Sequence, residues 1–354
     1  MPTARPLPAR RPARPAAPQP RALGRWLLVV ALMVFLIVVV GGITRITESG
    51  LSITEWKPVR GIVPPLNAAE WQAEFAAYKR IPQYAAFNLH MDLAGFKQIY
   101  FWEYIHRLLA RAIGLVLVLV MLAFWWRRAI PAGYGARMLI LLALGGLQGV
   151  IGWWMVASGL QARTEVSHIR LAVHLCAALL IYAALVWTVL DLFALARDPA
   201  ARAARLKAGA AAALAVLAVQ IVLGAFTAGL RAGYAFASWP LMGDRLFPEG
   251  GWNAGWGVVA NLVDNPVVVQ FAHRWWAWAA AAALLALGIA AKRRGATGPL
   301  HAVATALVLQ IGLGVATLLS GVDHGVAIAH QAMAVLLLTA AVSAAHAVGR
   351  TRPR

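Results

Sequence analysis

The sequence predicts an all-α polytopic membrane protein, with eight transmembrane helices arranged as two pseudo-symmetric four-helix bundles. Three observations predict this fold class: the composition, a series of long apolar stretches, and an internal repeat. Of the 354 residues, 61% are hydrophobic and only 13% are charged, whereas soluble domains average about 25% charged residues. The mean hydropathy of +0.70 excludes an ordinary soluble enzyme and indicates a chain that crosses a bilayer repeatedly.

Eight apolar stretches of about 18–25 residues are each long enough to cross a hydrocarbon core about 30 Å thick. Two of the connections are long, residues 44–101 and 230–269, and the alternation of sides places both on the same side of the membrane. The expected helices are residues 26–43, 102–125, 137–158, 168–192, 208–229, 270–291, 300–320 and 325–347.

The chain is expected to divide into two halves of four helices each. Residues 1–25, rich in Pro, Ala and Arg, are expected to form a disordered basic tail because this composition cannot bury an apolar core. An N-terminal half, 26–192, and a C-terminal half, 208–347, are joined by a linker at 193–207, and a short tail at 348–354 follows.

The net charge of +19 would suggest a nucleic-acid partner in a soluble protein. Sorted by membrane side, however, 19 of the 32 basic residues and only two of the 13 acidic residues lie on the side of the N-terminus. Because basic residues gather on the cytoplasmic side, both termini are predicted to be cytoplasmic and both long loops to be outside. The surplus is therefore a topology signal, and no nucleic-acid partner is expected.

The two halves repeat one another. Residues of the third and seventh helices match at a constant offset of 162, and the second and sixth helices share a His-Arg pair. This pattern predicts parallel repeats about an axis along the membrane normal. The matching residues are Gln148 and Gln310, Gly152 and Gly314, Ser158 and Ser320, Gly159 and Gly321, and His106-Arg107 and His273-Arg274.

Nine histidines need an explanation, and the single cysteine, Cys176, excludes an intramolecular disulfide and a cysteine-based zinc site. Four histidines lie one to two turns inside the outer end of an even-numbered helix, where a polar side chain by default marks function. The alternative is that hydrogen bonds to neighbouring helices satisfy them. These four are His106, His174, His273 and His330, whereas His90, His168, His301, His324 and His346 are expected to be solvated or interfacial.

Two facing histidines in each half suit haem iron, which takes two axial imidazoles, better than zinc, which needs more ligands. An alanine follows each histidine at i+4, on the same helix face, and leaves room for a macrocycle. Arg107 and Arg274 are candidates to neutralise haem propionates, the alternative being that they extend to the interface. The four alanines are Ala110, Ala178, Ala277 and Ala334.

The halves differ three residues before the first histidine of each pair. Glu103 precedes His106 on the same helix face, whereas its counterpart before His273 is the uncharged Gln270. A carboxylate beside only one site suggests that the N-terminal half performs chemistry while the C-terminal half carries electrons. The alternative is that Glu103 only pairs with Arg107 or lies at the lipid interface.

Several motifs together resemble those of haem A synthases, closest to the proteobacterial and mitochondrial branch, over roughly residues 26–347. The first outer loop carries Thr44-Arg45-Ile46-Thr47-Glu48-Ser49-Gly50-Leu51-Ser52, Glu55-Trp56-Lys57-Pro58, Pro64-Pro65-Leu66, Glu70-Trp71 and Phe96-Lys97. The helices and the second loop carry Glu103-Tyr104-Ile105-His106-Arg107, Ser238-Trp239-Pro240-Leu241-Met242 and Gln270-Phe271-Ala272-His273-Arg274.

The resemblance implies an oxidoreductase that converts haem O to haem A for cytochrome oxidase, by oxidising the ring C8 methyl to a formyl group through successive hydroxylations. It implies that His106 and His174 hold the substrate haem, that His273 and His330 ligate a haem b cofactor, and that Glu103 is catalytic. The carboxylate would accept a proton or stabilise developing positive charge. Haem O synthase, oxidase assembly factors, membrane lipid and an unidentified electron acceptor are the implied partners, and a homo-oligomer is compatible with the sequence.

The sequence departs from the family in three places. Some members have a cysteine pair in the first outer loop, which this chain lacks, so a mechanism that needs those thiols is excluded here. Met242-Gly243-Asp244 reverses the usual Asp-Gly order, and Gly95 stands where an acidic residue is frequent. Only local loop details are affected by the last two departures.

Two other functions are compatible with parts of the pattern. A di-haem cytochrome b-like protein that passes electrons from a quinol would explain four histidines, but not the Glu103/Gln270 difference or the loop motifs. A transporter with a two-fold repeat would place its polar residues at the membrane midplane, whereas these lie near one surface. Pigment extraction separates the alternatives, because only a haem A synthase would contain haem O or haem A.

Overall fold

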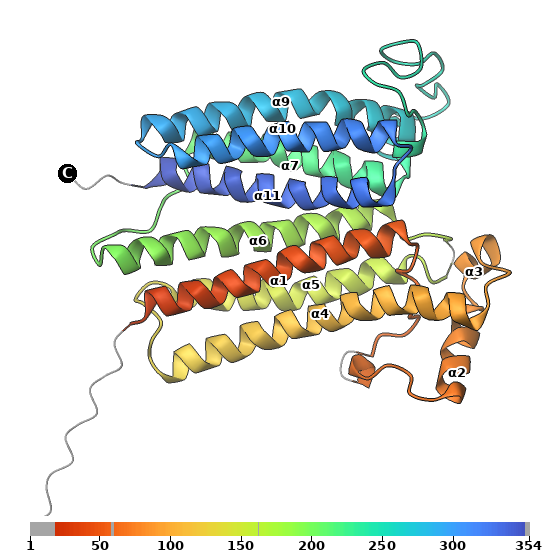
Figure 1. Cartoon of the computed structure of the whole chain (residues 1–354), viewed down its shortest axis with the longest axis horizontal. Helices are drawn as coiled ribbons and strands as arrows, with labels where there is room; N and C mark the ends of the chain where they lie inside the picture. Colours follow the sequence, from red (N-terminus) through yellow and green to blue (C-terminus); the bar gives the residue numbers. More distant parts are fainter. Residues whose placement is uncertain (1–17, 58–59, 162, 351–354) are drawn as a thin grey trace, which may run out of the picture.

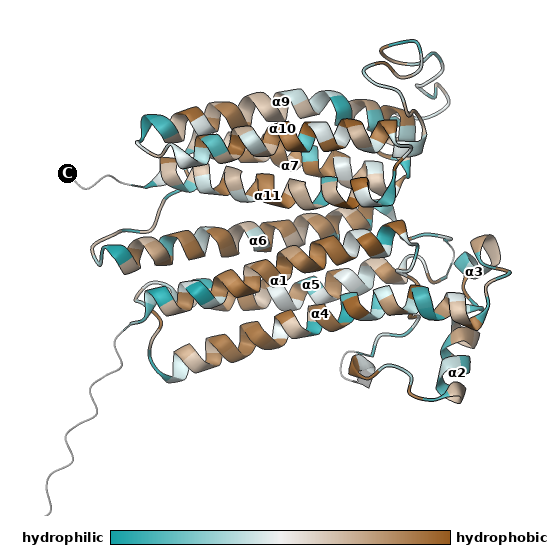
Figure 2. Ribbon diagram, in the orientation of Figure 1, coloured by the Kyte–Doolittle hydropathy of each residue, from teal (hydrophilic) through white to brown (hydrophobic). Residues whose placement is uncertain are grey.

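The computed structural model describes residues 18–57, 60–161 and 163–350, and within these ranges the chain forms helices and no β-strand. Eight helices are long and apolar enough to cross a membrane, which confirms the predicted fold class and number of spans (Figures 1 and 2). They are α1 Pro20–Ile46, α4 Leu93–Trp126, α5 Gly135–Ala157, α6 His168–Arg197, α7 Ala208–Gly229, α9 Pro266–Arg293, α10 Gly298–Leu319 and α11 His324–Gly349.

The tail and the linker are shorter than predicted. Helix α1 begins at Pro20, so the expectation of disorder is wrong for residues 20–25, while residues 1–17 lie outside the described part of the chain. Proline at the start of a helix has a suitable φ and loses no needed donor, and the Gln19 amide donates to the carbonyl of Ala129 at 2.9 Å. Helix α6 continues to Arg197, so the non-helical linker begins at Asp198.

The long helices lie side by side, with the first four on one side of the molecule and the last four on the other (Figure 1). Helix α6 packs against α1 and α5, α1 also contacts α4, and in the second group α10 packs on α9 and α11 while α7 packs on α9. The start of α1 and the end of α11 lie at one end of the bundle, the terminus end, and both long loops lie at the other, the loop end.

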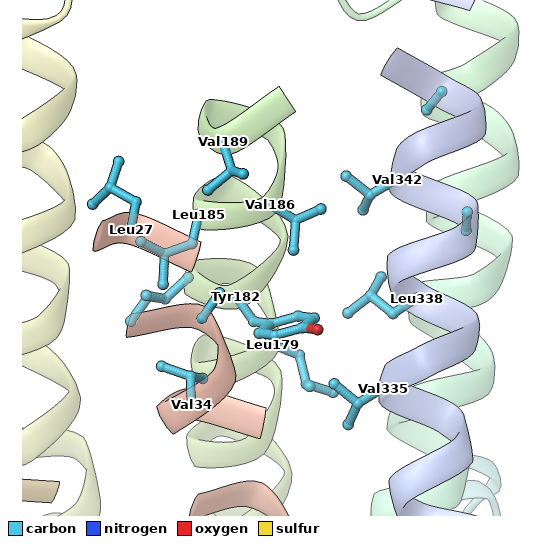
Figure 3. Packing of buried hydrophobic residues seen from close by; sticks show 14 of the residues in the cluster. Leu27, Val34, Leu179, Tyr182, Leu185, Val186, Val189, Val335, Leu338 and Val342 are labelled. Carbon is cyan, nitrogen blue, oxygen red and sulfur yellow. The ribbon is translucent and has the colours of Figure 1, made fainter. Parts of the chain in front are cut away.

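Apolar side chains join the two groups of helices along α1, α6 and α11 (Figure 3). The Tyr182 ring of α6 points toward α11, where its hydroxyl lies 2.8 Å from Oγ1 of Thr339. The other residues drawn at this contact are Leu27, Val34, Leu179, Leu185, Val186, Val189, Val335, Leu338 and Val342. The two groups therefore form one continuous core.

At the terminus end, a buried carboxylate ties the two groups together. Asp191 of α6 accepts from Arg137 of α5 at 2.7 Å, and its other oxygen lies 2.9 Å from Nε2 of His346 on α11. His346 and His168 are both buried, so the expectation that they are solvated or interfacial is wrong. His168 lies 3.2 Å from a carboxylate oxygen of Asp264. The hydrogen bond to Asp191 satisfies the buried His346 ring, as the cost of an unpaired polar group requires, whereas Nε2 of His168 makes no hydrogen bond within the described residues.

At the loop end, a group of four charged residues makes the corresponding connection. Arg45 at the end of α1 pairs with Glu165 at 3.1 Å and donates to the carbonyls of Ala228 and Gly229. Arg231, which follows α7, pairs with Glu165 and with Glu48. The ends of the first helix of each group are thereby held together.

The first long loop folds around a small core of its own. It contains η1 Arg60–Ile62, α2 Ala68–Tyr78 and α3 Pro82–Phe87, which lie beside the projecting start of α4 (Figure 1). Burial raises the pKa of Tyr78 to about 12, so its hydroxyl stays neutral and donates to Gln83 at 3.2 Å. The core residues are Leu51, Phe75, Tyr78, Ile81, Phe96 and Tyr100. The second loop contains η2 Ala232–Tyr234 and α8 Val258–Asp264.

Candidate functional site

The four candidate histidines stand on the four helices that start at the loop end. Each of these helices begins with a side-chain N-cap, which satisfies free backbone N–H groups and fixes the start of the helix. His174, His273 and His330 follow their caps by seven, eight and seven residues, and His106 follows its cap by 14. The caps are Asp92, Ser167, Asn265 and Asp323.

The different count for His106 reflects the length of its helix. Helix α4 projects further into the first loop than the other three, and seven residues correspond to about two turns. His106 therefore lies at a depth similar to that of the other histidines, with the extra turns packed into the core of the loop.

The helices bring the histidines together in two pairs. His106 is close enough to His174 for charges on the two rings to interact, and the same holds for His273 and His330. Among the described residues, no three His, Cys, Asp or Glu side chains gather as they would around a metal ion with only protein ligands. Two imidazoles alone suit an iron whose remaining positions are filled by a porphyrin, and not a closed zinc site.

Glycines on the neighbouring helices make room for the imidazole rings. A Cβ added to Gly152, Gly224 or Gly314 would lie 2.9, 3.0 and 3.0 Å from Cε1 of His174, His273 and His330 respectively. Gly41 approaches His106 in the same way, at 3.4 Å from Nε2. No larger residue fits at the first three positions without moving the ring, so the fold is built around four imidazoles, as a pair of bis-histidine haem sites requires.

The carboxylate of Glu103 is buried and fully engaged. Its Oε2 accepts from the Ser52 hydroxyl at 2.7 Å and from the Ile53 amide at 2.8 Å. Its Oε1 accepts from Nη2 and Nε of Arg107 at 2.7 and 3.1 Å. The pairing with Arg107, which was the alternative to a catalytic role, is therefore present, and both oxygens hold the first loop and the arginine in place.

Arg107 uses its remaining donors on the same loop. Its Nη1 and Nη2 donate to the carbonyls of Glu55 and Ile53 at 2.9 and 2.7 Å. The guanidinium therefore joins Glu103 to the loop segment that follows Ser52. No contact of this side chain tests the predicted neutralisation of a haem propionate.

The second half has the same arrangement without the charge pair. Arg274 donates to the carbonyls of Phe236 and Ser238, each at 2.8 Å, and Gln270 donates to Phe236 at 3.1 Å. The Nε of Arg274 and the Oε1 of Gln270 are buried with no partner within the described structure. In both halves the arginine after the histidine holds the long loop on its helix, but only the first half places a carboxylate there.

Reasoning from the sequence missed several residues at these sites. Ser52 and Ile53 contact Glu103 from a distant part of the chain, and no spacing rule relates them to it. Gln220 lies 3.1 Å from the imidazole of His273. The sequence feature that could have identified Gln220 is its position four residues before Gly224, the same spacing that separates Gln148 from Gly152.

Comparison with known proteins places this architecture in a family. The family model described as "Cytochrome oxidase assembly protein" matches residues 24–342. A "Heme A synthase" of Rhizorhabdus wittichii is 72% identical over 342 residues, which cover 96% of this chain and 98% of the relative. The "Heme A synthase" of Sphingopyxis alaskensis is 54% identical over 335 residues, 94% of each chain, and that of Novosphingobium aromaticivorans is 48% identical over 343 residues, covering 94% of this chain and 96% of the relative.

Proposed function

The chain belongs to the haem A synthase family of cytochrome oxidase assembly proteins, and from that premise we propose how its two halves divide the synthesis of haem A from haem O. The reaction is the oxidation of the C8 methyl of haem O to a formyl group. The observation that carries the division is that both halves present a pair of imidazoles, whereas only the first has a buried carboxylate three residues before its first histidine.

The first half is the proposed substrate site. His106 and His174 are the axial ligands of haem O, and the Gly41 and Gly152 approaches leave the space that their rings need. Glu103 contributes a fixed negative charge close to one ligand. Because both of its oxygens already accept hydrogen bonds, its geometry favours stabilisation of positive charge that develops on the substrate over acceptance of a proton.

The second half is the proposed cofactor site. His273 and His330 are positioned to hold a haem b, which supplies one-electron redox chemistry when bound. Gln270 brings no charge to this site, which suits electron transfer without a reacting carbon. Arg274 holds the start of the second loop on α9 through the carbonyls of Phe236 and Ser238.

The protein is proposed to lie in the bacterial inner membrane with both termini in the cytoplasm. The excess of basic residues near the terminus end supports this orientation, and it places both sites near the outer surface. Haem O synthase and the oxidase assembly machinery are the proposed neighbours, because the substrate and the product are both hydrophobic and pass between proteins in the same membrane.

Expression in a bacterial strain that makes haem O but lacks its own haem A synthase tests the function. Pigments extracted from these cells are expected to contain haem A, whereas haem O and haem b alone would contradict the proposal. The His273→Ala variant, purified from membranes, is expected to lose haem b and keep haem O. The matched His106→Ala variant is expected to show the reverse, and a His273→Ala protein with unchanged haem content would overturn the cofactor site.

A further inference from the structure

A glutamine stands one helical turn before the ring-contacting glycine on three of the four neighbouring helices. Gln148 precedes Gly152 on α5, and Gln220 precedes Gly224 on α7, each by four residues. The same spacing separates Gln310 and Gly314 on α10. Residues four apart lie on one helix face, so each glutamine faces the histidine that its glycine contacts.

These glutamines contact three of the four histidines directly. Gln148 Nε2 donates to the backbone carbonyl of His174 at 2.8 Å and lies 3.1 Å from Nδ1 of its ring. Gln220 makes the same two contacts with His273, at 3.0 and 3.1 Å. Gln310 differs: its Nε2 lies 3.4 Å from Nε2 of His330, and Nδ1 of His330 is buried with no partner within the described residues.

His106 is the exception. The residue four before Gly41 on α1 is Ile37, which has no polar group, and within the described structure no hydrogen bond reaches the His106 imidazole. The ring is also turned differently: it presents Nε2 and Cδ2 to Gly41, whereas the other three present Cε1 to their glycines. The missing glutamine and the different ring orientation occur at the same histidine.

The chemistry of ligation explains what the glutamine provides. An imidazole that gives its Nε2 lone pair to iron carries its proton on Nδ1, and this N–H needs an acceptor that fixes the ring orientation. The Oε1 atoms of Gln148, Gln220 and Gln310 are buried acceptors with no partner within the described residues. Rotation of the amide of Gln148 or Gln220, which gives up the bond to the histidine carbonyl, brings such an acceptor to Nδ1 of His174 or His273.

On the basis of the proposed function, we infer that Gln148 and Gln220 are positioning residues that fix the haem-ligating imidazoles of His174 and His273, and that Ile37 leaves His106 as the exchangeable ligand through which haem O enters and haem A leaves. The first half then has one fixed and one exchangeable ligand, which suits a haem that passes through. In the second half each imidazole has a glutamine beside a ring nitrogen, Gln220 at Nδ1 of His273 and Gln310 at Nε2 of His330, which suits a resident cofactor. Loss of such an outer partner lowers metal affinity about 10- to 100-fold.

The full chain, purified in detergent and loaded with haemin, allows a direct test by transfer of haem to excess apomyoglobin. Wild-type protein is expected to release haem in a fast and a slow phase. Ile37→Gln is expected to slow the fast phase about 10- to 100-fold, while the size-matched control Ile37→Leu leaves it unchanged. A fast phase that Ile37→Gln leaves at the wild-type rate would overturn the inference.

Variants of the second half test the inference independently. They remain informative if Ile37→Gln does not fold. Gln220→Leu is expected to speed the slow phase about 10- to 100-fold and to shift the low-spin electron paramagnetic resonance signal of one haem. Gln220→Glu, which keeps an acceptor, is expected to restore the slow phase. An unchanged slow phase and signal in Gln220→Leu would contradict the role of the glutamine. Haem A formation by the wild-type chain, assayed in parallel, shows separately whether the proposed function fails.

Discussion

The two halves of the molecule share one plan and differ in a few side chains at the loop end. Each half sets a pair of histidines against glycines, and each uses an arginine after the first histidine to hold a long loop on its helix. In the first half, Glu103 and Ile37 occupy the positions that Gln270 and Gln220 occupy in the second. Among the described residues, nearly the same scaffold thus carries one site with a glutamate–arginine pair and a histidine without a hydrogen-bonding neighbour, and one site with an arginine, no carboxylate and a glutamine beside each histidine.

Under the proposed division of roles, this difference separates a substrate site from a cofactor site without a change of fold. The charge pair of the first half lies where its loop meets α4, and it ties Ser52 and Ile53 to the helix. The second half replaces this connection with neutral hydrogen bonds from Gln270. In the proposed function, the first half uses the carboxylate near the reacting carbon and a route for haem exchange, and the resident cofactor of the second half needs neither.

Glu103→Gln is the variant expected to have the largest effect on the comparison. The amide keeps the shape of the side chain but removes the charge, so haem A formation is expected to fall about 10²- to 10³-fold, the range seen when one preorganised stabilising group is lost. The measurement is haem A produced per cell, with the haem content of the purified variant determined beside it.

The mirror variant Gln270→Glu is the matched control for Glu103→Gln. It builds in the second half the carboxylate–arginine spacing that the first half has, with Arg274 as partner. It is expected to bring no gain in haem A formation, since the reacting haem lies elsewhere. Full haem A production by Glu103→Gln at normal haem occupancy would show that the carboxylate only holds the loop.

Replacing either arginine is expected to lower the stability of the fold, by different amounts in the two halves. Arg107→Gln leaves Glu103 buried without its cation, and the loss of one partner of a buried pair costs about 3–5 kcal/mol. Arg274→Gln removes hydrogen bonds to the carbonyls of Phe236 and Ser238. Each lost hydrogen bond is expected to lower the stability by about 1 kcal/mol. Thermal unfolding of the purified variants measures both costs, and equal destabilisation would mean that the Glu103–Arg107 pair is not what distinguishes the halves.

Haem content in the same two variants tests the predicted role at the propionates. If the arginines bind propionates, each variant loses haem from its own half alone. If they act only on the loops, as their contacts with Ile53, Glu55, Phe236 and Ser238 indicate, the haem content follows stability and not the half that carries the change.

The helices were predictable because the hydropathy of a membrane span depends on its own residues. All eight spans were expected, with errors of a few residues at the ends, where Pro20 starts α1 and the α4 helix extends into the loop. The four histidines and Glu103 were identified from depth and repeat symmetry. Contacts such as Ser52 with Glu103, or His346 with Asp191, join residues about 50 and 155 positions apart, and no periodicity within one helix contains that information.

The glycines give a finer test of the comparison, because open and crowded positions alternate on the same helices. Gly314→Ala on α10 places a Cβ 3.0 Å from the His330 ring, whereas a Cβ at Gly312 meets nothing within 4 Å. Overpacking of this kind costs about 1–3 kcal/mol. Gly314→Ala is therefore expected to lower the melting temperature and haem retention, and Gly312→Ala to keep both near wild type.

The first half offers the same test and should respond unequally at its two histidines. A Cβ at Gly152 would lie 2.9 Å from the His174 ring, but at Gly41 the nearest atom, Nε2 of His106, is 3.4 Å away. Gly152→Ala is expected to release haem, while Gly41→Ala is tolerated because the unanchored ring of His106 can turn aside. Equal haem loss in the two variants would mean that His106 is held as firmly as His174, and the proposed difference between the halves would then be reduced to the charge of Glu103.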